Sequence, residues 1–213
     1  MIPAMIVPLL TRPELLDRLV ASIDFPVADL VIIDNGRCVT TPPSSSMVCR
    51  THVITLPANL GVSGSWNLGI KSTPFAPWWL VVNFDAYFPE GSLEKFRAQA
   101  DEAALLLSGG APPWCAFALG SRVVETVGLF DERLHPAYFE DNDYERRATF
   151  HGFPTRQSGI PVHHDNSSTL AAGYQARNDA TYGDNAEFYL AKVRSADMGE
   201  GWSLDRRRRL TWD

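Results

Sequence analysis

The sequence has few cysteines and no long apolar run. Its 213 residues include three cysteines, Cys38, Cys49 and Cys115, an odd number without Cys-x-x-Cys spacing. This pattern argues against a disulfide framework and a zinc site, and it predicts free thiols. No stretch approaches the roughly 18 apolar residues of a membrane-spanning helix. The N-terminus also lacks the basic region and cleavage site of a secretory signal, so we expect a cytoplasmic protein.

Basic charge is scarce as well. Lysine and arginine total 19 against 25 aspartates and glutamates, a net charge of −6. A broad nucleic-acid surface is therefore not expected, because such binding depends on neutralising phosphates. The exception is Arg206–Arg209, which offers weak contact with an anionic membrane or nucleic acid. A solvated tail or a clamp on the protein's own acidic face is the favoured interpretation of this run.

What the sequence does contain is a regular alternation of strand and helix patterns. This alternation predicts one α/β sandwich whose ligands bind beyond the carboxyl ends of the strands. In the final helical segment we expect Tyr182, Phe188, Tyr189 and Val193 to face inward. The expected strands are residues 4–7, 30–33, 53–56, 78–82 and 115–119, and the expected helices are residues 13–23, 64–71, 92–107, 122–127, 141–151 and one or two within 174–193.

Small polar residues cluster after the predicted strands. The segment 59–69 holds three glycines and two asparagines at the opening of a helix, which lets backbone N–H groups approach a phosphate or ribose. It matches neither the P-loop nor the Gly-x-Gly-x-x-Gly spacing, and a tight strand-to-helix turn explains it equally well. Asn83-Phe-Asp85 follows another strand, where one carboxylate either coordinates a hard cation or caps a turn.

Acids and histidines follow further along the chain. Glu140, Asp141 and Asp143 crowd the start of a helix and repel one another unless a cation, hydrogen bonds or a catalytic role separates their pKa values. The alternative is an N-cap, Asp141, with acids in the first turn. His163 and His164 follow residues 160–162 and suggest a metal or diphosphate contact, with Asp165 orienting either ring.

In this order and spacing, the motifs resemble the family 2 glycosyltransferases of GT-A fold, particularly the rhamnosyltransferase-like branch. The resemblance covers about residues 6–169. It implies a Rossmann-like α/β/α sandwich with a mixed, mainly parallel central sheet. We expect a GT-A domain at residues 1–170, with a nucleotide-binding half at about 1–90 and an acceptor half at about 91–170, and a helical extension at 171–213 packed on it. The motifs are residues 33–36 (Ile-Asp-Asn-Gly), 59–61 and 67–69 (both Asn-Leu-Gly), 83–85 (Asn-Phe-Asp), 127–132 (Val-Gly-Leu-Phe-Asp-Glu), 139–143 (Phe-Glu-Asp-Asn-Asp), 146–147 (Arg-Arg) and His163.

The resemblance also implies roles for individual residues. Asp85 matches the last acid of the Asp-x-Asp metal motif, whose first acid is replaced here by Asn83. His163 completes the metal or diphosphate site, with His164 as the competitor, and Asp141 is the catalytic base. Asp34 accepts a hydrogen bond from the nucleobase. The remaining residues implied for binding the nucleotide donor are Pro8, Thr11, Asn59, Gly61, Asn67 and Asn83.

Together these roles describe an inverting, metal-dependent glycosyltransferase. A carboxylate opposite the leaving nucleotide takes the acceptor's proton, and Mn²⁺ or Mg²⁺ balances the charge on the departing diphosphate. The imidazole ligand slightly favours Mn²⁺. Trp114, Tyr138 and Glu140 are weaker candidates for contacting the acceptor, because aromatic residues beside a cleft more often belong to the core.

The sequence leaves several alternatives open. The donor nucleotide is UDP, dTDP or GDP, and the acceptor is a glycan, a lipid-linked saccharide, a protein or a small molecule. The oligomeric state is open. The rival from another class is a catalytically silent nucleotide-sugar binding module, suggested by the short chain and by Asn83 in place of the first acid. A nucleotidyltransferase is disfavoured, because residues 8–12 lack a glycine-rich basic loop.

Overall fold

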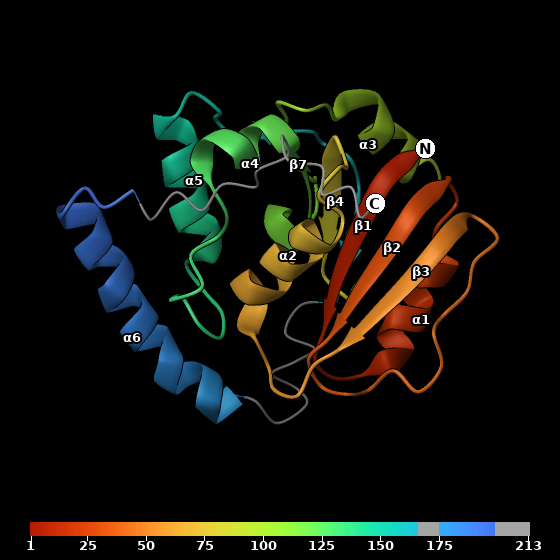
Figure 1. The fold of residues 1–213 in the computed structure, drawn as a ribbon, viewed down its shortest axis with the longest axis horizontal. Helices are drawn as coiled ribbons and strands as arrows, with labels where there is room; N and C mark the ends of the chain where they lie inside the picture. The colour runs from red at the N-terminus through yellow and green to blue at the C-terminus, as the bar shows by residue number, and fades with distance from the viewer. Residues whose placement is uncertain (166–174, 199–213) are drawn as a thin grey trace, which may run out of the picture.

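A seven-stranded sheet forms the centre of the molecule in the computed structural model, which describes residues 1–165 and 175–198 (Figure 1). The strand order is β3-β2-β1-β4-β7-β6-β8. The strands are β1 (Ile2–Leu9), β2 (Val27–Asp34), β3 (Val48–Thr55), β4 (Trp78–Val82), β6 (Leu105–Leu107), β7 (Ala116–Gly120) and β8 (Arg156–Gln157).

The sheet is mixed but mainly parallel. Strands β3, β2, β1 and β4 run parallel, β7 is antiparallel to both β4 and β6, and β8 is parallel to β6. Leu9 pairs with Asp34 and Asp34 with Thr55, so the first three strands end together at one edge. This confirms the mixed, mainly parallel sheet that the resemblance implied.

Helices cover both faces of the sheet, because its central strands are apolar on both sides. Within β4, Trp78, Leu80 and Val82 belong to one core cluster, and Trp79 and Val81 belong to the other. The first face packs against α1 (Pro13–Ala21) and α3 (Ser92–Gln99). The second packs against α2 (Gly61–Ser72), α4 (Ser121–Val127) and α5 (Glu140–Phe150).

One expected helix is wrong in its second half. The pattern predicted a helix over residues 92–107, but α3 ends at Gln99 and Leu105–Leu107 forms β6. Asp101 ends the helical course, because its carboxylate accepts the N–H of Ala103 in a local turn. The three leucines then alternate between the two core clusters, as strand residues do.

Two further elements complete the edge where β4 ends. A two-residue strand, β5 (Ala86–Tyr87), pairs antiparallel with β9 (His163–His164) in a small separate sheet. The short 3₁₀ helix η1 (Pro113–Cys115) precedes β7. Residues 160–162, expected as the end of a strand, form no strand, and the pairing begins one residue later.

The C-terminal helix α6 (Gln175–Arg194) lies beside α5, at the opposite end of the molecule from β3 (Figure 1). The expected inward face is partly wrong, because Tyr182 and Val193 are 49% and 41% exposed. Asn185 and Lys192 are buried instead. No helix in the described residues is long and apolar enough to cross a membrane. The run Arg206–Arg209 lies outside the described residues.

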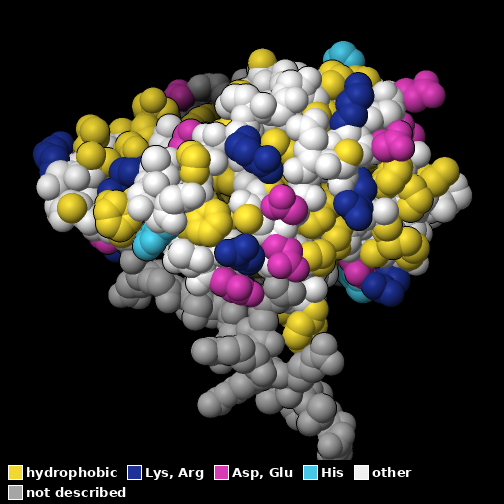
Figure 2. All heavy atoms as spheres, turned by 90° about the horizontal axis from the view of Figure 1, so that it is seen from above, with side chains coloured by type: hydrophobic (Ala, Val, Ile, Leu, Met, Phe, Trp, Pro, Cys, Tyr) yellow, Lys and Arg dark blue, Asp and Glu magenta, His cyan; other side chains and the backbone are white. Residues whose placement is uncertain are grey.

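Charges of both signs lie side by side on the face drawn in Figure 2. Among the described residues on that side, lysine and arginine side chains are interspersed with aspartate and glutamate. Interspersed charges of this kind produce only a weak long-range field.

Candidate active site

A carboxylate and an imidazole meet where β4 ends. The chain turns after Val82, with the Ala86 N–H donating to the Asn83 carbonyl, and this turn presents Asp85. Asp85 Oδ1 lies 2.9 Å from His164 Nε2, and both side chains are less than a tenth exposed. The Asn83 amide nitrogen lies 3.3 Å from the same ring nitrogen. Asn83 and Asp85 thus converge at the sheet edge with a histidine that is distant in sequence.

The neighbouring His163 points elsewhere, because adjacent side chains in a strand face opposite sides. Its exposed ring packs against Tyr87 with centroids 4.8 Å apart. The sequence favoured His163 as the partner of Asp85. The structure instead brings His164, the competitor, to that carboxylate.

Arg18 of α1 hydrogen-bonds to residues beside both short strands, β5 and β9. Its Nη2 donates to Asp165 Oδ2 at 2.7 Å and to the Asp85 carbonyl at 3.3 Å. The guanidinium carbon also lies 4.4 Å from the centroid of the Tyr87 ring. No role was expected for Arg18, since one arginine in an amphipathic helix carries no motif. In the fold it links the backbone of Asp85 to the side chain of Asp165, next to His164.

The Asp85 and His164 pair suits a divalent cation completed by a ligand. Neighbouring ligands of an octahedral ion with bonds of about 2.1 Å lie about 3 Å apart, close to the separation of these two atoms. Within the described residues, no group of three or more His, Cys, Asp or Glu side chains is arranged to hold a metal. The protein therefore offers two ligands here, and phosphate oxygens and water would have to supply the others.

Asp34, expected to meet the nucleobase, is wholly buried. Its two carboxylate oxygens accept the N–H groups of Cys38 and Val39 at 2.9 and 3.0 Å. Gly36 permits this tight loop, since a Cβ there would lie 1.8 Å from the Leu10 carbonyl oxygen. Asp34 thus orders the loop beside the end of β1 in this structure.

Pro8 and Thr11 flank that loop, and both are partly exposed. The Thr11 hydroxyl does not cap α1, whose N-cap is Arg12 in the left-handed region at φ 56°. Among the described residues this buried hydroxyl has no hydrogen-bond partner. It is therefore a buried polar group in the loop between β1 and α1.

Asparagine side chains hold the loop before α2 by accepting hydrogen bonds from its backbone N–H groups. Asn59 Oδ1 accepts the Gly61 N–H at 2.8 Å, and Asn35, which the sequence did not single out, accepts the Leu60 N–H at 2.9 Å. Gly61 has a φ of +73°, and a Cβ there would lie 2.7 Å from the Pro136 carbonyl oxygen. The glycine therefore allows this loop to touch the segment that leads into α5.

Asn67 is also engaged within the protein. Its Oδ1 accepts the Phe130 N–H at 3.0 Å, and its Nδ2 donates to the Phe130 carbonyl and to Glu132, both at 2.9 Å. The side chain is 1% exposed. Asn67 thus fastens α2 to the segment after α4, and a direct nucleotide contact by Asn67 stays a prediction.

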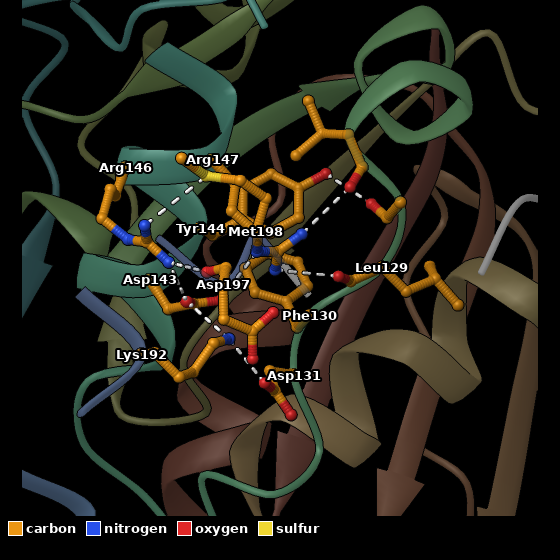
Figure 3. Close-up of polar contacts among 12 residues, drawn as sticks. Leu129, Phe130, Asp131, Asp143, Tyr144, Arg146, Arg147, Lys192, Asp197 and Met198 are labelled. Carbon is orange, nitrogen blue, oxygen red and sulfur yellow. Dashed lines mark hydrogen bonds and ion pairs between the residues drawn. The ribbon is translucent and has the colours of Figure 1, made fainter. Parts of the chain in front are cut away.

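The acids of α5 fall into two groups: those that form ion pairs, and those that form none among the described residues. Asp143 belongs to the first group. Its carboxylate lies 2.7 Å from Arg147 Nε and 2.7 Å from Lys192 Nζ, and the lysine also reaches Asp131 at 2.6 Å (Figure 3). Arg147 further donates to the carbonyls of Val127 and Leu129. Burial alone would raise the pKa of Asp131, but hydrogen bonds from Arg133 and Lys192 hold it well below its usual range. This buried network ties α6 to α5.

Glu140 and Asp141 are the second group. In the described part of the chain neither forms an ion pair, and Glu140 Oε2 is buried without a hydrogen-bond partner. Burial, with the neighbouring charge of Asp141, raises the pKa of Glu140 to about 8. Burial likewise raises the pKa of Asp141, whose Oδ1 accepts the Asn142 N–H at 2.8 Å. A carboxylate with a raised pKa is a stronger proton acceptor.

The helix α5 begins at Glu140, one residue earlier than predicted, so Asp141 is not its N-cap. The entry loop passes through Tyr138 and Phe139, whose φ angles are +79° and +71°. The Val62 N–H of α2 donates to the Pro136 carbonyl at 2.7 Å. Because α2 follows the end of β3, this contact brings the α5 entry to the edge of the sheet that also carries Asp85.

The two aromatic candidates differ in their surroundings. Trp114 of η1 is half-buried and packs edge-on against Phe117, 4.7 Å between centroids, beside the second core cluster. Tyr138 is half-buried and packs edge-on against Tyr182 of α6 at 5.2 Å. Trp114 therefore contributes to the core, whereas Tyr138 lies next to the α5 acids.

Both the sequence and the fold were compared with those of known proteins. No family model matches the sequence. The chain is 35% identical over 112 residues to a galactofuranosyl glycosyltransferase of Leishmania donovani, an alignment that covers 52% of this chain and 25% of that protein. The chain thus spans about a quarter of the length of this relative.

Two solved structures are similar in fold. TarS of S. aureus matches with a TM-score of 0.63 at 16% identity, over 94% of this chain and 41% of that one. GalNAc-T7, solved with UDP, GalNAc and Mn²⁺, matches with a TM-score of 0.59 at 10% identity, over 76% of this chain and 43% of that one. At such identities the likeness establishes the fold, which is the GT-A fold of glycosyltransferases.

Proposed function

We propose that this protein is a glycosyltransferase that moves a sugar from a nucleotide-diphosphate sugar to an acceptor hydroxyl. The observation that carries the proposal is the meeting of Asp85 with His164 at the sheet edge of a GT-A fold, with the unpaired acids of α5 brought to the same edge. The similarity to a galactofuranosyl glycosyltransferase supports it. So do the complexes of TarS residues 1–349 with UDP and with UDP-GlcNAc.

Asp85 and His164 would hold Mn²⁺ or Mg²⁺ beside the donor diphosphate. When bound, such an ion supplies positive charge to the leaving group. The Mn²⁺ in the GalNAc-T7 complex supports this part of the proposal. We assign the imidazole role to His164 in place of His163, because its ring faces the carboxylate. The Asn83 amide nitrogen lies 3.3 Å from that same ring nitrogen, so Asn83 borders the proposed metal position.

Asp141 is the proposed base of an inverting transfer. Its carboxylate takes the acceptor proton as the new bond forms, on the side of the sugar opposite the leaving nucleotide. Asp143 is unsuited to this task, since its oxygens are held by Arg147 and Lys192. Glu140 is the other candidate base, because it too has no counter-ion among the described residues.

The finer parts of the assignment are proposals as well. They comprise membership of family 2 and its rhamnosyltransferase-like branch, the division at residue 170, a cytoplasmic location, and a UDP, dTDP or GDP donor. For the donor site, Pro8, Thr11 and Asn59 are candidates for direct contact. Asp34, Gly61 and Asn67 shape the loops that would surround the nucleotide.

A catalytically silent nucleotide-sugar binding module is the second candidate. The specific observation in its favour is that Asn83 stands where the metal motif has its first acid, which leaves one protein carboxylate at the site. Hydrolysis of the donor separates the two. A transferase transfers sugar slowly to water without an acceptor, whereas a binding module releases none.

The test screens UDP-, dTDP- and GDP-sugars, including a galactofuranose donor, for Mn²⁺-dependent thermal shift and then for sugar release. A ligand at 100 times its dissociation constant adds about 2.7 kcal/mol of stability. We expect one nucleotide series to stabilise the wild type but not the Asp85→Ala variant, and to be hydrolysed. A stabilising donor that is never hydrolysed would favour the binding module, and no Mn²⁺-dependent shift with any donor would overturn both.

A further inference from the structure

We infer that Tyr138 and Tyr182 form an aromatic corner that binds a sugar ring of the acceptor, so that the acceptor is a saccharide or carries one. The inference deepens the proposed function and rests on it. It adds Tyr182, a residue of α6, to a site whose other residues lie on or beside the central sheet.

The corner is made by two elements distant in sequence. The ring centroids of Tyr138 and Tyr182 lie 5.2 Å apart and the ring planes meet at 72°, so the two rings pack edge to face. The Phe139 ring lies 5.2 Å from Tyr182 and stacks on Tyr189 at 5.5 Å and 21°. Four aromatic rings therefore join the entry of α5 to one side of α6.

Both tyrosines of the corner are partly exposed. Tyr182 is 49% exposed, and Tyr138 is half-buried. A pyranose or furanose ring presents one face of C–H groups, which packs on an aromatic face, and a rim of hydroxyls, which needs polar partners. An aromatic corner beside unpaired carboxylates meets both requirements.

The corner also lies next to the proposed base. Phe139 precedes Glu140 and is two residues before Asp141. Burial raises the pKa of Tyr189, and neighbouring charges, Asp141 among them, contribute to the shift. A sugar bound at the corner would thus bring its own hydroxyls toward Asp141. The unpaired charge of Asp141 disfavours an anionic group in the same place.

The backbone of this segment is held in a costly conformation. Tyr138 and Phe139 are consecutive non-glycine residues with positive φ, a conformation that persists only where its surroundings impose it. Asn185 of α6 imposes it in part, since its amide donates to the Ala137 carbonyl at 2.8 Å and more weakly to that of His135 at 3.4 Å. Such strain is typical of a segment whose side chains must point in a set direction.

The experiment measures binding of methyl glycosides by saturation-transfer NMR, without a donor. The probes are the α and β methyl glycosides of galactose, glucose, mannose and rhamnose, with glycerol as a polyol lacking a ring. The variants are Tyr182→Ala, Tyr138→Ala and the conservative Tyr182→Phe. The matched control is Leu190→Ala, because Leu190 is 48% exposed on the same helix and has no ring contact.

We expect at least one glycoside to receive saturation on its ring C–H protons in the wild type. Binding should weaken about tenfold in Tyr182→Ala and Tyr138→Ala, and persist in Tyr182→Phe and Leu190→Ala. Absence of binding by every glycoside, or equal effects of Tyr182→Ala and Leu190→Ala, would overturn the inference. Donor hydrolysis by the same variants is measured separately. A protein that hydrolyses the donor but binds no glycoside refutes the corner and leaves the transferase proposal standing.

Discussion

Asp141 and Asp143 stand two positions apart on α5, yet their surroundings differ completely. Asp143 is wholly buried and paired with Arg147 and Lys192. Asp141 is partly exposed, and in the described residues it has only a backbone N–H as a polar partner. The same residue type therefore stands in two opposite environments within one helical turn.

This difference indicates how an acid that stabilises the fold can be distinguished from a candidate catalytic acid. A buried acid with cations on both sides contributes to folding, because removing either partner leaves an uncompensated charge. An acid whose pKa is raised by burial, with no cation to stabilise its charge, lowers stability and is retained for chemistry. Each prediction below either separates these two purposes or shows that they are one.

The largest effect is expected from removing the proposed base. Asp141→Asn keeps the size of the side chain but cannot accept a proton, so turnover should fall by about 10² to 10⁴. The free energy of unfolding and the donor affinity should stay close to the wild type. The measurements are initial rates of sugar transfer, urea unfolding and calorimetric titration with the donor.

Asp143→Asn and Glu140→Gln are the controls for Asp141→Asn. Asp143→Asn should lose stability instead of turnover per folded molecule. Near-normal transfer by Asp141→Asn would refute its role, and a large loss in Glu140→Gln would then make Glu140 the base. If Asp141→Asn and Asp143→Asn lose stability equally, the distinction between the two acids fails.

The next effect concerns the paired acids. Lys192→Met removes the cation between Asp131 and Asp143 and leaves both carboxylates short of a partner. We expect a loss of about 3–5 kcal/mol in the free energy of unfolding, measured by urea denaturation. Arg194→Met, an exposed cation two residues away, should change it by less than about 0.5 kcal/mol. A loss below 1 kcal/mol for Lys192→Met would show that the network does not hold α6.

A smaller effect is expected at the metal pair. Removing His164 or Asp85 as alanine variants should weaken Mn²⁺-dependent nucleotide affinity at least about tenfold, since even outer partners of metal ligands cost that much. His163→Ala, which loses only a ring contact with Tyr87, should leave the affinity within about twofold. Calorimetry in Mn²⁺ and in EDTA checks all three. A larger loss for His163→Ala than for His164→Ala would restore the assignment favoured by the sequence.

The fold was largely predictable because its signals are local. Unbroken apolar runs such as Trp78–Val82 predicted buried parallel strands, and the order of motifs predicted the GT-A fold. The error at residues 92–107 has a physical cause. Three leucines at the end of a helical pattern fit a helix or a strand equally well, and the sheet edge available beside β7 decided between them.

The site was predictable only in part, because its geometry depends on which way side chains turn. A two-residue strand decides between His163 and His164, and no sequence pattern reveals its register. Likewise, Glu140, Asp141 and Asp143 look alike in sequence until Lys192, some 50 residues later, pairs with one of them. Arg18 and Tyr182 carry no motif, so only the tertiary contacts disclose them.

The most specific effect is the pH dependence of stability due to Glu140. Its pKa of about 8 in the folded protein exceeds the ordinary 4.5 expected in the unfolded chain. Between these values the folded state keeps a proton that the unfolded state releases, so stability falls as the pH rises through this window. Glu140→Gln removes the titration. We therefore expect the wild type to lose about 1 kcal/mol per pH unit relative to the variant between pH 5 and pH 8.

Urea unfolding at pH 5, 6, 7 and 8 measures this difference, with Glu94→Gln, an exposed glutamate of α3, as the control. Parallel curves for the wild type and Glu140→Gln would mean that Glu140 is stabilised as an anion in solution. It would then belong with the paired acids such as Asp143.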